Sequence, residues 1–246
     1  MINISRSILT AAKLQTVELR YARGEIVYEH GAPAQLVYAV DEGALHRFRL
    51  LSENQRSIRQ FLFPGDGFGY EIGRRHRDTV QALKPTKVLA AARGALLAAA
   101  TSDPGLCNLL FTAAAQAVVV AEDQPVMRRV GVARIAQFLL EMDARIAMRG
   151  EINLPMHRRH IADHVGLTLE TVCRVLTAFQ LEELIKFRDR TQRRLVIRDK
   201  KRLQLLVSDA LDFDYLSVLK RKAVNAPTAV SAATAHRADV AAPSFT

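Results

Sequence analysis

Residues 157–179, HRRHIADHVGLTLETVCRVLTAF, hold the pattern of two short helices joined by a tight turn. Three apolar residues share one face of the first helix: Ile161, Ala162 and Val165. Gly166 supplies the turn, and Thr168 is a good N-cap for the second helix. Four apolar residues form the buried face of that second helix: Val172, Val175, Leu176 and Phe179. We therefore predict a helix-turn-helix, a motif whose second helix enters the major groove of DNA.

The opposite face of the second helix carries Glu170, Cys173 and Arg174. An arginine fork can make two hydrogen bonds to guanine, and a carboxylate can accept one from the amino group of cytosine. We therefore expect these three side chains to contact bases. The alternative for Glu170 and Arg174 is an exposed ion pair at positions i and i+4, which contributes only a few tenths of a kcal/mol.

A basic stretch follows the second helix and is expected to lie on the DNA backbone. Between Ile185 and Arg202 there are nine Lys or Arg residues and only two acids. Residues 184–197 form two apolar runs around a basic turn, which predicts a β-hairpin wing; a merely solvated hairpin is the alternative. Contacts to phosphate fix the register of a protein on DNA without carrying sequence information. We expect such contacts from His157, Arg158, Thr168, Thr171, Arg190 and Arg193.

The N-terminal half has a different pattern, of short apolar stretches separated by turn residues. Five stretches have the length of strands: residues 25–28, 36–40, 44–50, 57–62 and 87–91. Glycine and proline interrupt them at regular intervals, at Gly24, Gly31, Gly43, 64–66, Gly69 and Pro85. This punctuation predicts an antiparallel β-roll or barrel over residues 20–103, after an N-terminal segment of residues 1–19.

A long helix is predicted to begin after Asp103 and Pro104. Apolar or small residues recur there at steps of four and three: Leu106, Leu110, Ala113, Ala117, Val120, Gln124 and Met127. Such a seam can face the helix's own domain or a second copy of the chain. Pro125 predicts a kink or break, after which the pattern resumes over residues 133–142 and stops at Gly150. Residues 104–149 are therefore expected to form a helix and hinge, residues 150–222 the helix-turn-helix domain, and residues 223–246, which lack bulky groups, a disordered tail.

Composition narrows the class of protein. The chain has 246 residues, 49% of them hydrophobic, and a formal net charge of +10, which favours an anionic partner. No apolar run approaches the roughly 20 residues that span a bilayer, so a cytoplasmic protein is expected. The sequence contains no phosphate-binding loop or nucleophile elbow, and so predicts neither an enzyme nor a bound cofactor. His157, His160 and His164 have helical spacing, but no fourth ligand accompanies them and no metal site is expected.

With these motifs in hand, the chain resembles the CRP/FNR superfamily of transcription regulators over roughly residues 20–200. Residues 23–31, 37–43 and 63–69 resemble the family's cyclic-nucleotide-binding-type β-roll. Residues 165–174, VGLTLETVCR, resemble its recognition helix. The resemblance implies an α+β protein with a β-roll, a long dimerisation helix and a C-terminal winged helix-turn-helix.

The resemblance also implies partners. It implies a homodimer joined by the long helix through Leu106, Leu110, Ala113, Ala117, Val120 and Met127. That dimer would bind a palindrome such as TTGAT and its inverted repeat in double-stranded DNA, contact RNA polymerase and act as an activator.

Departures from the family pattern point to one branch of it. The family's phosphate-binding pairs are not intact in residues 69–79, GYEIGRRHRDT, so no cyclic nucleotide is expected, although Arg77 could still meet an anion. No cysteine precedes Cys107, which excludes the N-terminal iron-sulfur cluster. What remains resembles the FixK-type branch, which implies control of microaerobic, nitrogen-fixation or denitrification genes. The alternative is a haem- or small-ligand-sensing regulator of the nitric oxide response, which His30, His46 and His76 keep open.

The two cysteines are expected to be reduced thiols with different roles. Cys107 on the helix seam is expected to be a buried packing residue. Cys173 lies beside Arg174 on the DNA-facing surface, where a thiol has reason to be partly ionised. Oxidation would add negative charge facing DNA, so Cys173 is a redox candidate; an inert small residue that permits close approach is the alternative.

Overall fold

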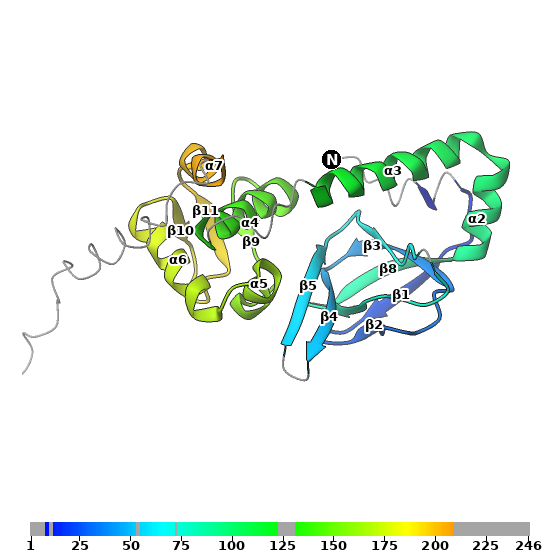
Figure 1. Cartoon of the computed structure of the whole chain (residues 1–246), viewed down its shortest axis with the longest axis horizontal. Helices are drawn as coiled ribbons and strands as arrows, with labels where there is room; N and C mark the ends of the chain where they lie inside the picture. Colours follow the sequence, from blue (N-terminus) through cyan, green and yellow to red (C-terminus); the bar gives the residue numbers. More distant parts are fainter. Residues whose placement is uncertain (1–7, 10–11, 53–54, 72, 123–130, 209–246) are drawn as a thin grey trace, which may run out of the picture. The chain divides into compact units, whose positions relative to one another are not determined.

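The computed structural model describes residues 8–9, 12–52, 55–71, 73–122 and 131–208. Figure 1 shows the chain with its helices and strands labelled. Gln124, Pro125 and Met127 of the predicted seam and the predicted tail at residues 223–246 lie outside the described residues. Within those residues, no helix is both long enough and apolar enough to cross a membrane.

The N-terminal part is a β-roll of two four-stranded sheets, in the order β1-β8-β3-β6 and β2-β7-β4-β5. Every strand pair is antiparallel, as predicted. The strands are β1 (Val17–Tyr21), β2 (Ile26–Tyr28), β3 (Leu36–Glu42), β4 (Leu45–Ser52), β5 (Gln55–Leu62), β6 (Gly67–Phe68), β7 (Thr79–Ala82) and β8 (Thr86–Ala92). Strands β1, β6 and β7 were not predicted.

The apolar core of the roll lies between its two sheets. One sheet contributes Val40, Phe68 and Val88, and the other contributes Leu45 and Val80, all of them buried. Because side chains alternate along a strand, one face of β3 and β8 lines this core, while Val37 and Ala91 on the opposite face belong to a second apolar cluster.

A close approach between two turns leaves no room for a side chain at Gly43. This residue has φ +104°, and a Cβ there would lie 2.3 Å from Thr86 Oγ1. The Thr86 hydroxyl in turn accepts a hydrogen bond of 3.1 Å from the backbone N–H of Ala44. Only glycine fits this position.

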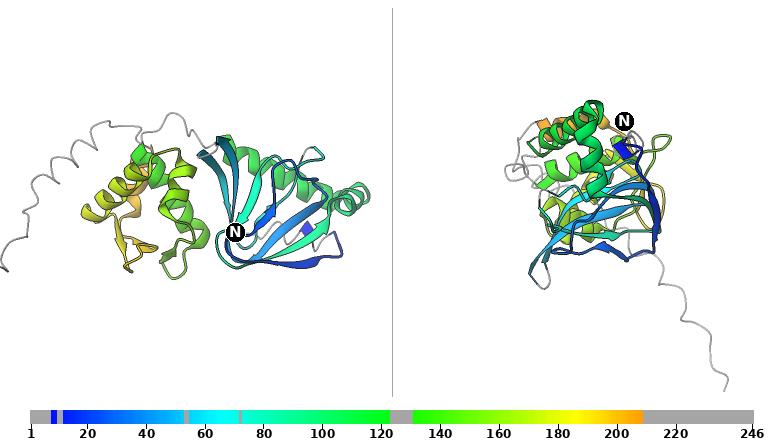
Figure 2. Two further views of the ribbon diagram at one scale, coloured as in Figure 1. Left: turned by 90° about the horizontal axis from the view of Figure 1, so that it is seen from below. Right: turned by 90° about the vertical axis from the view of Figure 1, so that its right-hand side faces the viewer.

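Two helices follow the roll, α2 (Arg93–Ser102) and α3 (Pro104–Glu122), and Figure 2 shows them from two further sides. Asp103 starts α3, since its carboxylate accepts hydrogen bonds from the backbone N–H groups of Gly105 (2.8 Å) and Leu106 (3.2 Å). Leu106 is buried against the roll together with Val37, and Leu110 is partly buried against the same cluster. The first turns of the predicted seam therefore face their own domain.

The prediction for Cys107 was wrong, because its thiol is exposed. One residue is a rotation of about 100° on a helix, so Cys107 points away from the face that Leu106 buries. Of the other seam residues, Ala113, Ala117 and Val120 lie on α3, and their side chains are outside the described part of the structure.

The C-terminal part begins with α4 (Gly131–Ile146), whose apolar face is buried. The predicted stop at Gly150 was wrong by four residues, because the helix already ends at Ile146. Arg149 and Gly150 instead have positive φ angles of 53° and 77° and form a tight turn, closed by hydrogen bonds between Met148 and Glu151. The remaining elements are β9 (Ile152–Asn153), α5 (Arg158–Val165), α6 (Leu169–Leu181), β10 (Ile185–Phe187), β11 (Arg194–Ile197) and α7 (Lys200–Ser208).

Burial of His76 inside the roll predicts a pH dependence of stability. Its ring is 3% exposed and stacks on Tyr28 with 3.5 Å between centroids. Burial lowers the pKa of His76, against an opposing contribution from the Glu71 carboxylate. At low pH the unfolded chain therefore binds a proton that the folded chain does not. The free energy of unfolding should fall as the pH drops below the ordinary histidine value of about 6.5.

Urea denaturation followed by circular dichroism at about pH 7.5 and about pH 5.5 measures this effect. His76→Gln should lose less stability between the two pH values than the unsubstituted chain does. His30→Gln is the matched control, because His30 is exposed, and it should keep the original pH dependence. An unchanged pH dependence in His76→Gln would contradict the assignment.

Candidate nucleic-acid interface

The helices α5 and α6 meet through their apolar faces, as the sequence predicted. Gly166 has φ 67° and ends α5, and the backbone N–H of Leu167 donates 3.1 Å to the carbonyl of Ala162. The residues that the two helices bury are Ile161, Ala162, Val165, Val172, Val175, Leu176, Ala178 and Phe179. Arg134 of α4 donates hydrogen bonds to the carbonyls of Val165 and Gly166 and so fixes the turn between α5 and α6 to α4. The sequence did not predict this contact.

The opposite face of α6 presents the three residues predicted to contact bases. Arg174 Nη2 lies 2.5 Å from Glu170 Oε1, and the side chains are 68% and 70% exposed. Cys173 is half-buried between them and has a free thiol. The chain without DNA thus has the exposed ion pair that was the alternative interpretation. An exposed pair of this kind contributes only a few tenths of a kcal/mol, so base contacts can replace it.

Two threonines organise the start of α6. The backbone N–H of Thr171 donates 3.1 Å to Thr168 Oγ1, and the two hydroxyl oxygens are 2.8 Å apart. Thr168 is therefore the N-cap that the sequence predicted. Both threonines lie at the end of α6 that carries Glu170. Thr168 is exposed and Thr171 is half-buried.

The wing is the predicted hairpin with one additional strand. Strand β10 pairs antiparallel with β11, in a register that joins Ile185 to Ile197, and β11 also pairs with β9, which was not predicted. Asp189 shapes the turn, since its carboxylate accepts from the backbone N–H groups of Arg193 (3.1 Å) and Arg194 (2.9 Å). Arg190, predicted to contact the DNA backbone, is exposed at this turn.

The structure brings the start of α5 and the base of the wing together. Arg193 Nη2 lies 2.7 Å from His157 Nδ1, and the Arg158 guanidinium hydrogen-bonds the side chain of Gln192 and lies 5.6 Å from the centre of the Phe187 ring. Burial, and then the positive charge of Arg193, lowers the pKa of His157. Two contacts therefore join the start of α5 to the wing and its turn: Arg193 with His157, and Arg158 with Gln192, a residue that the sequence did not single out.

Comparison with known proteins agrees with this geometry. A model of the Crp-like helix-turn-helix domain matches residues 133–206, and a model of the cyclic nucleotide-binding domain matches residues 18–103. The chain is 32% identical over 195 residues to the nitrogen fixation regulation protein FixK of Azorhizobium caulinodans, covering 76% of this chain and 78% of that protein. The chain belongs to the CRP/FNR family of transcription regulators.

Further comparisons agree with the FixK-type branch of the CRP/FNR family. FixK of Rhizobium meliloti is 33% identical over 169 residues, covering 69% of this chain and 78% of that protein. The solved structure of FixK2 from Bradyrhizobium japonicum matches with a TM-score of 0.75 and 38% identity, covering 78% of this chain and 98% of that one. The predicted α+β fold, with a β-roll and a C-terminal helix-turn-helix, is confirmed for this CRP/FNR regulator.

The N-cap of α6 predicts a stability effect that is independent of DNA. Thr168→Ala removes the acceptor for the Thr171 N–H and should lower the free energy of unfolding by about 1 kcal/mol. Thr168→Ser is the matched control, because it keeps the hydroxyl and should stay within about 0.5 kcal/mol of the original. Urea denaturation of the three proteins measures the difference. Equal stability of the alanine and serine variants would contradict the role of the cap.

Proposed function

We propose that this transcription regulator binds a palindromic FNR/FixK-type operator, TTGAT and its inverted repeat, as a homodimer with one α6 helix in each half-site. The single observation that carries the proposal is the exposed Glu170–Arg174 pair on α6 beside the cationic wing. A helix with such a face and a buried opposite face is suited to reading base edges in the major groove.

Base readout begins when the ion pair on α6 opens. Arg174 then makes two hydrogen bonds to guanine, and Glu170 accepts one from a cytosine amino group. Both side chains are about 70% exposed, so neither has to leave a packed environment to reach DNA. Their mutual attraction is replaced by contacts that exist only with the right base pair, which is a source of specificity.

The DNA backbone is contacted from three places around α6. Thr168 and Thr171 lie at its start, His157 and Arg158 at the start of α5, and Arg190 and Arg193 on the wing. The contact of His157 with Arg193 supports this assignment, because it joins the wing to the start of α5. These contacts set affinity and register, while α6 sets sequence preference.

Dimerisation is assigned to α3, within a connector that spans residues 104–149. Leu106 packs against the β-roll of its own chain, so it is the later positions of α3, on the side away from the roll, that we assign to contact with a second chain. Phe111 supports this assignment, since it is a large apolar side chain of α3 that is 72% exposed. A dimer of this kind matches the two-fold symmetry of a palindrome.

The proposed physiological role is activation of microaerobic, nitrogen-fixation or denitrification genes in the cytoplasm, through contact with RNA polymerase. Two parts of this role are supported by the names of relatives. The nitrogen fixation regulation protein FixK of Azorhizobium caulinodans supports the target genes, and the transcriptional activator protein Anr of Pseudomonas protegens, 32% identical over 173 residues, supports activation. Of the histidines that suggested the haem alternative, His30 is exposed and the other two are buried. His46 is 1% exposed, and His76 is stacked on Tyr28.

Substitutions on α6 and on the wing should act on different properties of DNA binding. Glu170→Ala and Arg174→Ala should each lose about 1–3 kcal/mol of preference at their own base pair. Arg190→Ala, the control on the wing, should weaken binding to all sequences and lower the salt slope by about 1. Competition gel shifts with the palindrome, single-base variants and scrambled duplex, at several salt concentrations, separate these effects. Equal binding of the palindrome and the scrambled duplex by the unsubstituted protein would contradict the proposal that the palindrome is its operator.

We also propose that oxidation of Cys173 weakens operator binding. Two molecules of hydrogen peroxide each transfer one oxygen atom to the Cys173 sulfur and leave as water, first giving the sulfenate and then the sulfinate. The sulfinate places a lasting negative charge between Glu170 and Arg174. Peroxide should therefore reduce operator binding of the unsubstituted protein but not of Cys173→Ser. Cys107→Ser is the matched control, because Cys107 is exposed on α3 and its loss should leave the peroxide sensitivity intact. If Cys173→Ser is as sensitive as the original, Cys173 is not the switch.

A further inference from the structure

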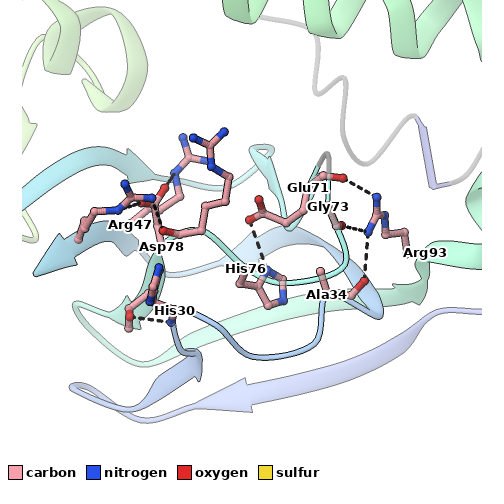
Figure 3. A network of polar contacts seen from close by, with 11 residues as sticks. His30, Ala34, Arg47, Glu71, Gly73, His76, Asp78 and Arg93 are labelled. Carbon is pink, nitrogen blue, oxygen red and sulfur yellow. Dashed lines mark hydrogen bonds and ion pairs between the residues drawn. The ribbon is translucent and has the colours of Figure 1, made fainter.

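In the β-roll, three arginine side chains surround the carboxylate of Asp78. Asp78 has a side chain only 11% exposed, and its carboxylate oxygens lie 3.3 Å from Arg49 Nε, 3.5 Å from Arg59 Nε and 3.7 Å from Arg47 Nε. Figure 3 shows Arg47 and Asp78 within this cluster, next to the loop that carries Glu71 and His76. The cluster contains none of the residues assigned to DNA contact and has no role in the proposed base readout.

Strand geometry explains why these four residues meet. Leu45 faces the core, and alternation puts Arg47 and Arg49 on that same side of β4. The antiparallel pairing of β4 with β7 joins Phe48 to Thr79, which brings the preceding residue, Asp78, beside Arg49. On the other side, the register of β4 with β5 shifts between Arg47 and Phe48, at the level of Arg59.

The fold of this domain implies an anionic ligand, because the matching family model is that of a cyclic nucleotide-binding domain. The residues of this roll do not fit such a ligand. Arg77, which the sequence offered as a contact for an anion, has an exposed side chain, whereas the buried neighbour among the cations is the carboxylate of Asp78. A phosphate in the same place would meet a like charge at close range, which is unfavourable in a poorly solvated site.

We infer that Asp78 is a built-in anion, which occupies the arginine cluster of Arg47, Arg49 and Arg59 and closes it to phosphate-bearing ligands. A free anion loses translational entropy when it binds. The Asp78 carboxylate is already part of the chain and does not have this cost, so it has an advantage over any external anion.

The charges and hydrogen bonds of the cluster show what removing Asp78 would leave behind. Three guanidinium groups face one carboxylate, a formal excess of two positive charges. The Nε atoms of Arg47 and Arg49 and Asp78 Oδ1 are buried and have no hydrogen-bond partner among the described residues. The attraction in the native cluster is therefore mainly that between charges. Without the carboxylate, two partly buried arginines with unsatisfied Nε–H groups would remain beside the half-exposed Arg59, which is a site for an oxyanion.

The loop beside the cluster is also fixed by the chain itself. Arg93 donates to the carbonyl oxygens of Gly73 (2.6 Å) and Glu71 (2.5 Å), and Arg49 Nη2 donates 2.5 Å to the carbonyl of Arg77. Figure 3 shows the contacts of Arg93 and the hydrogen bond between His76 and Glu71 that span this loop. These hydrogen bonds connect the loop that leads to Asp78 to the body of the roll.

The test compares anion binding by the full chain before and after removal of the carboxylate. Isothermal titration calorimetry and thermal shift are measured with inorganic phosphate and, separately, with cyclic AMP, at constant ionic strength set with chloride. The unsubstituted protein should show no saturable binding of either anion. Asp78→Ser should bind phosphate at least about tenfold more tightly and melt at a higher temperature when phosphate is present.

Three further variants make the test decisive. Asp78→Asn keeps the shape of the side chain and should show the same gain, which covers the case in which Asp78→Ser does not fold. The double variant Asp78→Ser/Arg49→Gln should lose the gain. Glu29→Gln removes the same charge from an exposed position of the roll and should behave like the unsubstituted protein. Saturable binding of phosphate or cyclic AMP by the unsubstituted protein, or no gain in either Asp78 variant, would overturn the inference.

Discussion

Burial of one apolar stripe on α6 determines which of its side chains are available to DNA. Val172, Val175 and Phe179 have no exposed surface, and a helix repeats every 3.6 residues. Glu170 and Arg174 must then lie on the far side, four residues apart and in contact with each other. Rotating the helix to hide these charges would expose three large apolar side chains, at a cost of about 1.5–3 kcal/mol each. The reading surface therefore follows from the packing of the domain.

Elements that are specified by local periodicity could be predicted from the sequence, and α5, α6 and the wing belong to this class. The N-cap at Thr168 and the turn at Gly166 were also predicted, because a cap and a left-handed residue depend on only a few neighbours. Three strands were not predicted. Strand β6 has two residues and β7 has four, too few to show an alternation, and β1 lies before the first stretch of clear strand pattern.

Contacts between residues distant in the sequence could not be predicted in this way. The cluster around Asp78 needs the register of β4 with both of its neighbours, and that register includes an irregularity that no short motif announces. Arg134 reaches the end of α5 from a helix more than thirty residues earlier in the chain. In the stretch 69–79 the sequence did show that the phosphate-binding pairs are not intact, but not which group stands in for the phosphate. The exposure of Cys107 depends on a rotation of about 100° between it and Leu106 on the helix, and the seam alone did not fix which of the two faces the core.

The same pair of residue types has opposite consequences in the two halves of the molecule. Glu170 and Arg174 are solvated, so their attraction is weak and screened, and an external partner can separate them at little cost. Asp78 is largely withdrawn from water, and separating it from its arginines would leave uncompensated charges in a poorly solvated place. An anion that approaches the roll therefore meets a carboxylate that is costly to displace. A base pair that approaches α6 meets the Glu170 carboxylate, which is easily separated from Arg174. Solvent exposure thus decides which of the two ion clusters can exchange its internal partner for an external one.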